Sequence, residues 1–80
     1  MDAQSMNKAI VWSQQGCQYC DTTIALLKAR GCEVEERKIA TGKWTKKDLL
    51  DEVPNARSVP QIFIDGKHIG GYNDLVNILQ

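Results

Sequence analysis

The sequence predicts an α/β fold in which helices cover both faces of a four-stranded mixed sheet, with elements in the order β-α-β-α-β-β-α. Short apolar segments rich in β-branched residues alternate with segments whose apolar residues recur at helical spacing. An Asp65-Gly66 dipeptide between the last two apolar segments is typical of a two-residue hairpin turn. With 80 residues, the chain has room for one domain, which we expect to span residues 1–80.

The first three elements are a strand, a helix and a second strand. Residues 8–12 (KAIVW) are apolar and bounded by polar residues, as in a buried strand. Residues 18–30 have a helical apolar stripe, and Gly31 ends this helix. Residues 32–39 alternate partly in polarity and predict a more exposed strand. Because a helix links these two strands, we expect them to be parallel. The stripe consists of Cys20, Ile24 and Leu27.

A short helix and a hairpin follow. Thr45 and Asp48 have the spacing of a helix-starting cap, and Pro54 ends the helix that they begin. Residues 61–65 (QIFID) and 67–70 (KHIG) predict two strands on either side of the hairpin turn, which makes them antiparallel.

The chain ends in a third helix. The Gly70-Gly71 pair breaks the fourth strand, and Asn73 is expected to cap the helix that continues through Leu79. Its apolar residues Leu75, Val76 and Leu79 lie on one stripe, which predicts packing against the sheet.

The composition excludes several classes of function. Ten Lys and Arg residues balance ten Asp and Glu residues, so the net charge is zero, unlike that of proteins that wrap nucleic acid or coat anionic membranes. No apolar run approaches the roughly 18 to 20 residues of a membrane span. Residues 1–8 lack the apolar segment of a signal peptide, and we expect residues 1–7 to be a loose tail in a cytoplasmic protein.

The number of cysteines, three, indicates the redox environment in which the protein works. An odd number does not fit a secreted disulfide scaffold, and three is one too few for a zinc site made of thiolates alone. We therefore expect an intracellular chain whose thiols are reduced at rest, with no resident metal. Cys32, at the start of the second strand, is expected to be a small packing residue.

Two of the cysteines form the sequence Cys17-Gln18-Tyr19-Cys20 directly after the first strand. A helix N-terminus offers free N–H groups and partial positive charge, which favour the reactive thiolate at Cys17. Cys20 lies one turn further on and can form a disulfide with Cys17. Half of a zinc site and an accidental pair of core cysteines are the alternatives, and the strand-helix context favours redox chemistry over both.

Two further segments carry candidate site residues. Pro60 directly precedes a strand, and from the sequence alone the Val59-Pro60 bond is expected to be trans. The Gly70-Gly71 pair followed by a helix start is either a plain turn or a backbone receptor for a carboxylate.

Taken together, these motifs resemble those of the glutaredoxins, members of the thioredoxin-like superfamily. The resemblance covers residues 8–80 and rests on the CxYC pair, on Ser58-Val59-Pro60 leading into QIFIDGKHIGG, and on the glycine pair before the last helix. It implies a thioredoxin-like fold and a glutathione-dependent thiol-disulfide oxidoreductase. The Cys20-Asp21 junction and the small size are similar to those of bacteriophage glutaredoxins.

The resemblance also implies a role for each residue near the pair. Cys17 attacks a disulfide or a glutathionylated protein, and Cys20 resolves the mixed disulfide. Pro60 is expected to be cis, against the expectation from sequence alone, and the backbone of Val59 pairs with the cysteinyl part of glutathione. Tyr19 is expected to line the glutathione groove.

The ends of glutathione are assigned in the same way. Gly71, Asn73 and Asp74 are expected to receive the γ-glutamyl end, with backbone N–H groups on its carboxylate and Asp74 on its ammonium. Gln14 stands where relatives often have a lysine that holds the glycine carboxylate, which predicts weaker charge assistance there. Lys47 and Arg57 are candidates to supply this charge, and the alternative for both is a solvated surface.

The resemblance leaves two alternative functions open. Gln18 stands where proline is common, and some relatives without it hold a [2Fe-2S] cluster between two subunits. A redoxin fed by thioredoxin reductase, without glutathione, is the other alternative. The expected partners are glutathione and disulfide-bearing or glutathionylated proteins, including ribonucleotide reductase by analogy. We expect a monomer that binds neither nucleic acid nor membrane.

Overall fold

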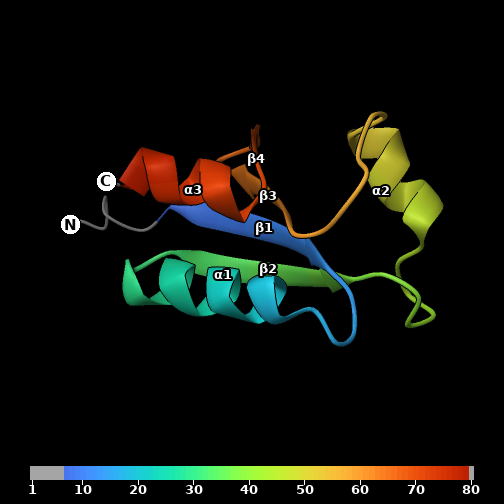
Figure 1. The fold of residues 1–80 in the computed structure, drawn as a ribbon, viewed down its shortest axis with the longest axis horizontal. Coiled ribbons are helices and arrows are strands. Elements are labelled where there is room, and N and C mark those ends of the chain that lie inside the picture. The colour runs from blue at the N-terminus through green and yellow to red at the C-terminus, as the bar shows by residue number, and fades with distance from the viewer. Residues whose placement is uncertain (1–6, 80) are drawn as a thin grey trace.

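The computed structural model describes residues 7–79 and confirms the predicted order of elements (Figure 1). Of the tail expected over residues 1–7, only Asn7 is described, and its carbonyl accepts a hydrogen bond from the N–H of Glu33 at 2.8 Å. The elements are β1 (Lys8–Ser13), α1 (Gln18–Ala29), β2 (Glu33–Lys38), α2 (Lys46–Glu52), β3 (Gln61–Ile64), β4 (Lys67–Gly70) and α3 (Tyr72–Leu79).

The four strands form one mixed sheet in the order β2-β1-β3-β4. β1 pairs with β2 in parallel and with β3 in antiparallel, and β3 pairs with β4 across the hairpin. Asp65 and Gly66, with φ of 52° and 83°, form the left-handed turn that the dipeptide predicts. β1 is therefore a central strand, and its C-terminal end points to the site described below.

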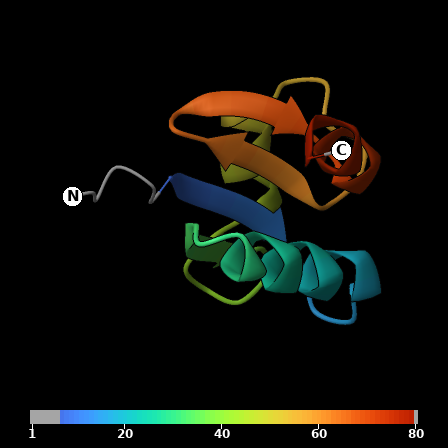
Figure 2. The ribbon, with the colours of Figure 1, turned by 90° about the vertical axis from the view of Figure 1, so that its left-hand side faces the viewer.

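Successive residues of β1 enter two different hydrophobic clusters because side chains alternate across a strand. Ala9 and Val11 pack with Leu27 of α1 and Leu75 of α3 on one face. Trp12 packs with Leu49 of α2 on the other face. The sheet thus has helices on both faces, with α1 and α3 together on one side, at the right of Figure 2.

The start of α3 differs from the prediction. The helix begins at Tyr72, so Asn73 lies inside its first turn and is not the cap. The carboxylate of Asp74 instead accepts a hydrogen bond from the N–H of Gly71 at 2.9 Å. Gly71 has no side chain with which to cap the helix, so an acid three residues further on reaches back to its N–H.

The start of α2 confirms the predicted cap. The Thr45 hydroxyl accepts a hydrogen bond from the N–H of Asp48 at 3.1 Å, and the Asp48 carboxylate accepts one from the N–H of Thr45 at 2.9 Å. This reciprocal pair satisfies two N–H groups that a helix start leaves without intrahelical partners.

None of the helices within residues 7–79 combines the length and the apolar character needed to cross a membrane.

We expect Thr45→Ala to lower the free energy of unfolding by about 1 kcal/mol, because the variant removes the cap of α2. Thr45→Ser keeps the hydroxyl and should lose less than half as much. Urea denaturation of both variants and the parent protein measures the difference. Equal stability of the alanine variant and the parent would show that the cap contributes nothing.

Candidate active site

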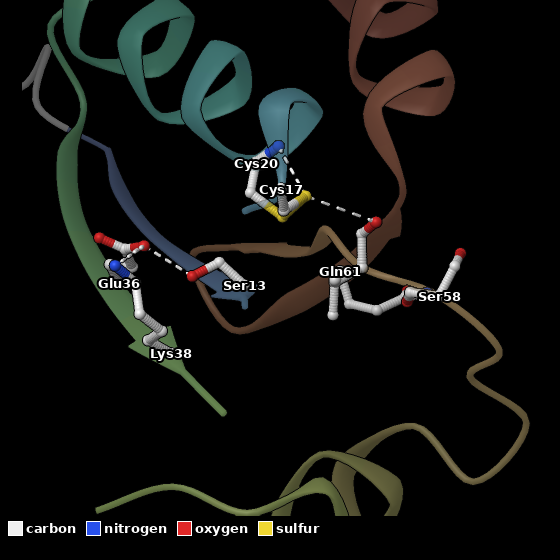
Figure 3. Close-up of a disulfide and its surroundings, with 8 residues drawn as sticks. Ser13, Cys17, Cys20, Glu36, Lys38, Ser58 and Gln61 are labelled. Atoms are coloured by element: carbon white, nitrogen blue, oxygen red, sulfur yellow. Dashed lines mark hydrogen bonds and ion pairs between the residues drawn. A yellow bond between two sulfur atoms is a disulfide. The ribbon is translucent and has the colours of Figure 1, made fainter. Parts of the chain in front are cut away.

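Cys17 is placed by the junction between β1 and α1. The strand ends at Ser13, a short loop follows, and Cys17 has the extended backbone (φ −93°, ψ 103°) of the residue that caps α1. Its sulfur accepts a hydrogen bond from the N–H of Cys20 at 3.1 Å (Figure 3). A first-turn N–H group that the helix cannot satisfy is therefore directed at this sulfur, which favours negative charge there.

Cys17 and Cys20 are joined by a disulfide, and their Cα atoms lie 5.2 Å apart. Cys17 is partly exposed, whereas Cys20 has none of its surface exposed. The difference in exposure separates the two thiols chemically, because only Cys17 is accessible to a bulky disulfide substrate. Cys20 is suited to react with a sulfur already attached to Cys17.

The loop before β3 lies against Cys17. The Val59-Pro60 peptide bond is cis, so the sequence-only expectation of trans is wrong and the expectation from the resemblance is confirmed. The carbonyl oxygen of Val59 lies 4.0 Å from the sulfur of Cys17. The side chain of Gln61 donates a hydrogen bond to the carbonyl of Ser58 at 2.9 Å, which ties this loop to the start of β3 (Figure 3).

A groove of about 270 Å³ opens between the starts of α1 and α3, and its lining includes Val59, whose carbonyl lies near the sulfur of Cys17. Six residues expected from the sequence line it together, although they come from three separate segments. Sequence reasoning missed Ser58 and Tyr72, which directly adjoin predicted site residues and also line the groove. The rings of Tyr72 and Tyr19 are 5.2 Å apart and form an aromatic wall. The six expected residues are Tyr19, Val59, Pro60, Gly71, Asn73 and Asp74.

The three residues considered for the glycine end of glutathione do not lie together. Gln14 and Arg57 line a second cavity of about 270 Å³, which shares Val59 and Ser58 with the groove. Lys47 lines neither cavity, and its exposed ammonium pairs with Asp51 at 3.4 Å. The second cavity also contains Lys46, so its positive charge comes from Arg57 and Lys46.

Two ionisable groups away from the groove have shifted pKa values. Burial, with a smaller contribution from Asp65, raises the pKa of the Cys32 thiol. Cys32 packs against the cluster under α1 and α3, as expected for a packing residue. A hydrogen bond from Arg37 at 2.8 Å lowers the pKa of Glu35. Neither group is among the residues that line the groove.

The described chain offers no metal site of its own. Within residues 7–79, no three His, Cys, Asp or Glu side chains are grouped so that they could hold a metal ion. Cys17 and Cys20 are bonded to each other. The residues of this chain alone therefore do not fit a [2Fe-2S] cluster, which would need ligands from outside it.

The sequence of this chain is similar to those of known proteins. Residues 9–69 match the glutaredoxin family model. The chain is 37% identical to glutaredoxin 3 of Escherichia coli K12 over 65 residues, which cover 81% of this chain and 77% of that protein. Bacterial and plant proteins are among the relatives, and they do not support a particular likeness to bacteriophage glutaredoxins.

Solved structures show the same fold. Glutaredoxin 1 of Francisella tularensis, complexed with cacodylate, superposes with a TM-score of 0.76 at 26% identity and covers 91% of this chain and 92% of that one. A buckwheat glutaredoxin-glutathione complex superposes with a TM-score of 0.71 at 30% identity, and the match covers 89% of this chain and 66% of that one.

We expect Gly70→Ala to lower the free energy of unfolding by about 1 to 3 kcal/mol. Gly70 has a φ of 123°, and an added Cβ would collide with the carboxylate of Asp74, which holds the N–H of Gly71. Gly66→Ala is the matched control, because Gly66 also has a positive φ (83°) but no atom within 4 Å of an added Cβ. Urea denaturation measures both losses, and equal losses would show that the contact with Asp74 has no effect.

Proposed function

The chain belongs to the glutaredoxin family and is a thiol-disulfide oxidoreductase, and from this premise we propose that Cys17 is its nucleophile, Cys20 its resolving thiol and glutathione its electron donor. One observation carries the assignment of roles. The partly exposed Cys17 caps α1, and its sulfur accepts a hydrogen bond from the N–H of Cys20, whereas Cys20 is fully buried.

Reduction of a protein disulfide then proceeds in two exchanges. The Cys17 thiolate attacks one sulfur of the substrate, forming a mixed disulfide and releasing the other substrate sulfur as a thiolate that takes up a proton. The Cys20 thiolate attacks the sulfur of Cys17, which forms the Cys17-Cys20 disulfide and releases the second substrate thiol. Two electrons pass from the protein dithiol to the substrate.

Glutathione restores the dithiol by the same chemistry. One glutathione thiolate attacks the protein disulfide to give a Cys17-glutathione mixed disulfide and the Cys20 thiol. A second glutathione attacks the glutathione sulfur, which yields glutathione disulfide and the Cys17 thiolate. With a glutathionylated protein as substrate, Cys17 takes the glutathionyl group directly, and only the second of these steps is needed.

The groove beside Cys17 is suited to the glutathione part of these intermediates. The backbone of Val59 lies beside the sulfur of Cys17, where it can pair with the cysteinyl residue of glutathione. Asn73 and Asp74 lie in the first turn of α3, whose N–H groups favour the γ-glutamyl carboxylate. The buckwheat relative binds glutathione, which supports this assignment by analogy.

The second cavity is suited to the opposite end of glutathione. Arg57 and Lys46 bring positive charge beside Gln14, and a carboxylate is favoured by such charge. We assign the glycine carboxylate to this cavity and not to Lys47, which pairs with Asp51 outside it.

The proposed protein clients are those with disulfides or attached glutathione, with ribonucleotide reductase as an example by family analogy. A cytoplasmic monomer fits this role, because the glutathione pool of the cytosol supplies the electrons. No contact in the described residues favours an iron-sulfur carrier or a redoxin fed by thioredoxin reductase.

We expect Cys17→Ser to reduce turnover of a glutathionylated substrate to background, because the nucleophile is lost. Cys20→Ser should retain activity on that substrate within about threefold but lose at least about tenfold on a protein disulfide, which needs the resolving thiol. Coupled glutathione reductase assays measure both activities. Full activity of Cys17→Ser together with an inactive Cys20→Ser would reverse the assigned roles.

We expect Asp74→Asn to raise the KM for glutathione about three- to tenfold with little change in kcat, because the variant removes the charge opposite the γ-glutamyl ammonium. Asp51→Asn on α2 is the matched control, since Asp51 pairs only with the exposed Lys47 among the described residues. Steady-state kinetics at varied glutathione concentrations measure the effect. An unchanged KM in Asp74→Asn would remove Asp74 from the glutathione site.

A further inference from the structure

Two fully buried hydroxyl groups differ in their hydrogen bonding. Ser13 and Thr23 are the fully buried polar side chains among residues 7–79. The Ser13 hydroxyl donates to the carboxylate of Glu36 at 2.6 Å, as Figure 3 shows beside the disulfide. The Thr23 hydroxyl has no hydrogen-bond partner. A buried hydroxyl without a partner is costly, so it needs an explanation.

The position of Thr23 relates it to Cys20. Both residues lie on the buried face of α1, three positions apart, which makes them neighbours on the helix surface. A threonine inside a helix can instead bond to the carbonyl four residues earlier, but Thr23 makes no such bond here. Its hydroxyl is therefore confined with Cys20 between α1 and the sheet.

Oxidation weakens Cys20 as a partner for Thr23. The sulfur of Cys20 is bonded to Cys17 and carries neither a hydrogen nor a charge, so it is at most a weak acceptor, and the Thr23 hydroxyl makes no hydrogen bond to it. Reduction gives Cys20 a thiol, which donates weakly, or a thiolate, which accepts strongly. A hydroxyl can bond to either form, donating to the thiolate or accepting from the thiol. The free-energy cost of the unpartnered hydroxyl thus destabilises the disulfide form and is reduced in the dithiol form.

We propose that Thr23 is a positioning residue that stabilises reduced Cys20 and so shifts the equilibrium of the Cys17-Cys20 pair towards the dithiol. The inference rests on the proposed roles of the two cysteines. It concerns the exchange in which one protein disulfide and two glutathione molecules give one protein dithiol and one glutathione disulfide. The Thr23 hydroxyl raises the equilibrium constant of that reaction and also supports the Cys20 thiolate that resolves the mixed disulfide.

The test removes the hydroxyl while keeping the shape of the side chain. Thr23→Val should lower the equilibrium constant for reduction by glutathione about three- to tenfold, the range expected for one hydrogen bond. Thr23→Ser keeps a hydroxyl and should stay within about twofold of the parent protein. Thr22→Val makes the same chemical change on the exposed side of α1 and is the matched control. Acid quenching and alkylation in glutathione buffers, followed by mass spectrometry, measure the dithiol fraction.

A second measurement separates this role from simple packing. Urea denaturation of the oxidised and the reduced forms of each variant closes a thermodynamic cycle with the redox equilibrium. Thr23→Val should destabilise the reduced form relative to the oxidised form, whereas a packing defect would lower the stability of both forms equally. If Thr23→Val does not fold, Thr23→Ala carries the same comparison between the two forms.

The outcomes separate the inference from the proposed function. A lower equilibrium constant in Thr23→Val, with Thr23→Ser and Thr22→Val close to the parent, supports the role of Thr23. An unchanged constant in Thr23→Val, or the same shift in Thr22→Val, overturns it. Either overturning result leaves the proposed function intact as long as the parent disulfide still equilibrates with glutathione. A parent disulfide that does not equilibrate with glutathione overturns both.

Discussion

The hydrogen bond from the N–H of Cys20 to the sulfur of Cys17 is the interaction on which the site depends. It exists because β1 ends just before α1 begins, so that Cys17, the nucleophile we propose, is also the cap of the helix. The cap would ordinarily be a serine, threonine, aspartate or asparagine oxygen. Using sulfur there gives up some helix stability but directs backbone dipoles at the atom that carries negative charge in the proposed mechanism.

The rest of the fold keeps this helix start in place. α1 packs through Leu27 on the face of β1 that bears Ala9 and Val11, and α3 joins it there through Leu75. Both helices start at the same end of the sheet (Figure 1), and the first turn of α3 lines the same groove as Tyr19. The opposite face is closed by Trp12 and Leu49, which anchor α2 and leave the groove side free. A chain of 80 residues thereby combines a core on each face of its sheet with an open binding surface.

Local sequence patterns predicted the parts of the structure that depend on neighbouring residues. The apolar run of β1, the capping box of Thr45 and Asp48, and the Asp65-Gly66 turn all follow from local sequence patterns and are present in the structure. The start of α3 was predicted wrongly, because Asn73 is a good cap by type but the Asp74 carboxylate already satisfies the N–H of Gly71. Which of two suitable residues caps a helix depends on the geometry of their side chains, and residue spacing in the sequence does not reveal that geometry.

The sequence by itself determined the order of elements, the redox pair and, through a resemblance to a family, the segments that form the site. Only the tertiary structure decided that Arg57 adjoins the site whereas Lys47 turns to Asp51, and that Tyr72 completes the aromatic wall. It also showed that Thr23 is buried without a partner while Ser13 has one. These properties depend on contacts between segments far apart in the chain, and a local pattern records the type of a side chain but not what it meets across the fold.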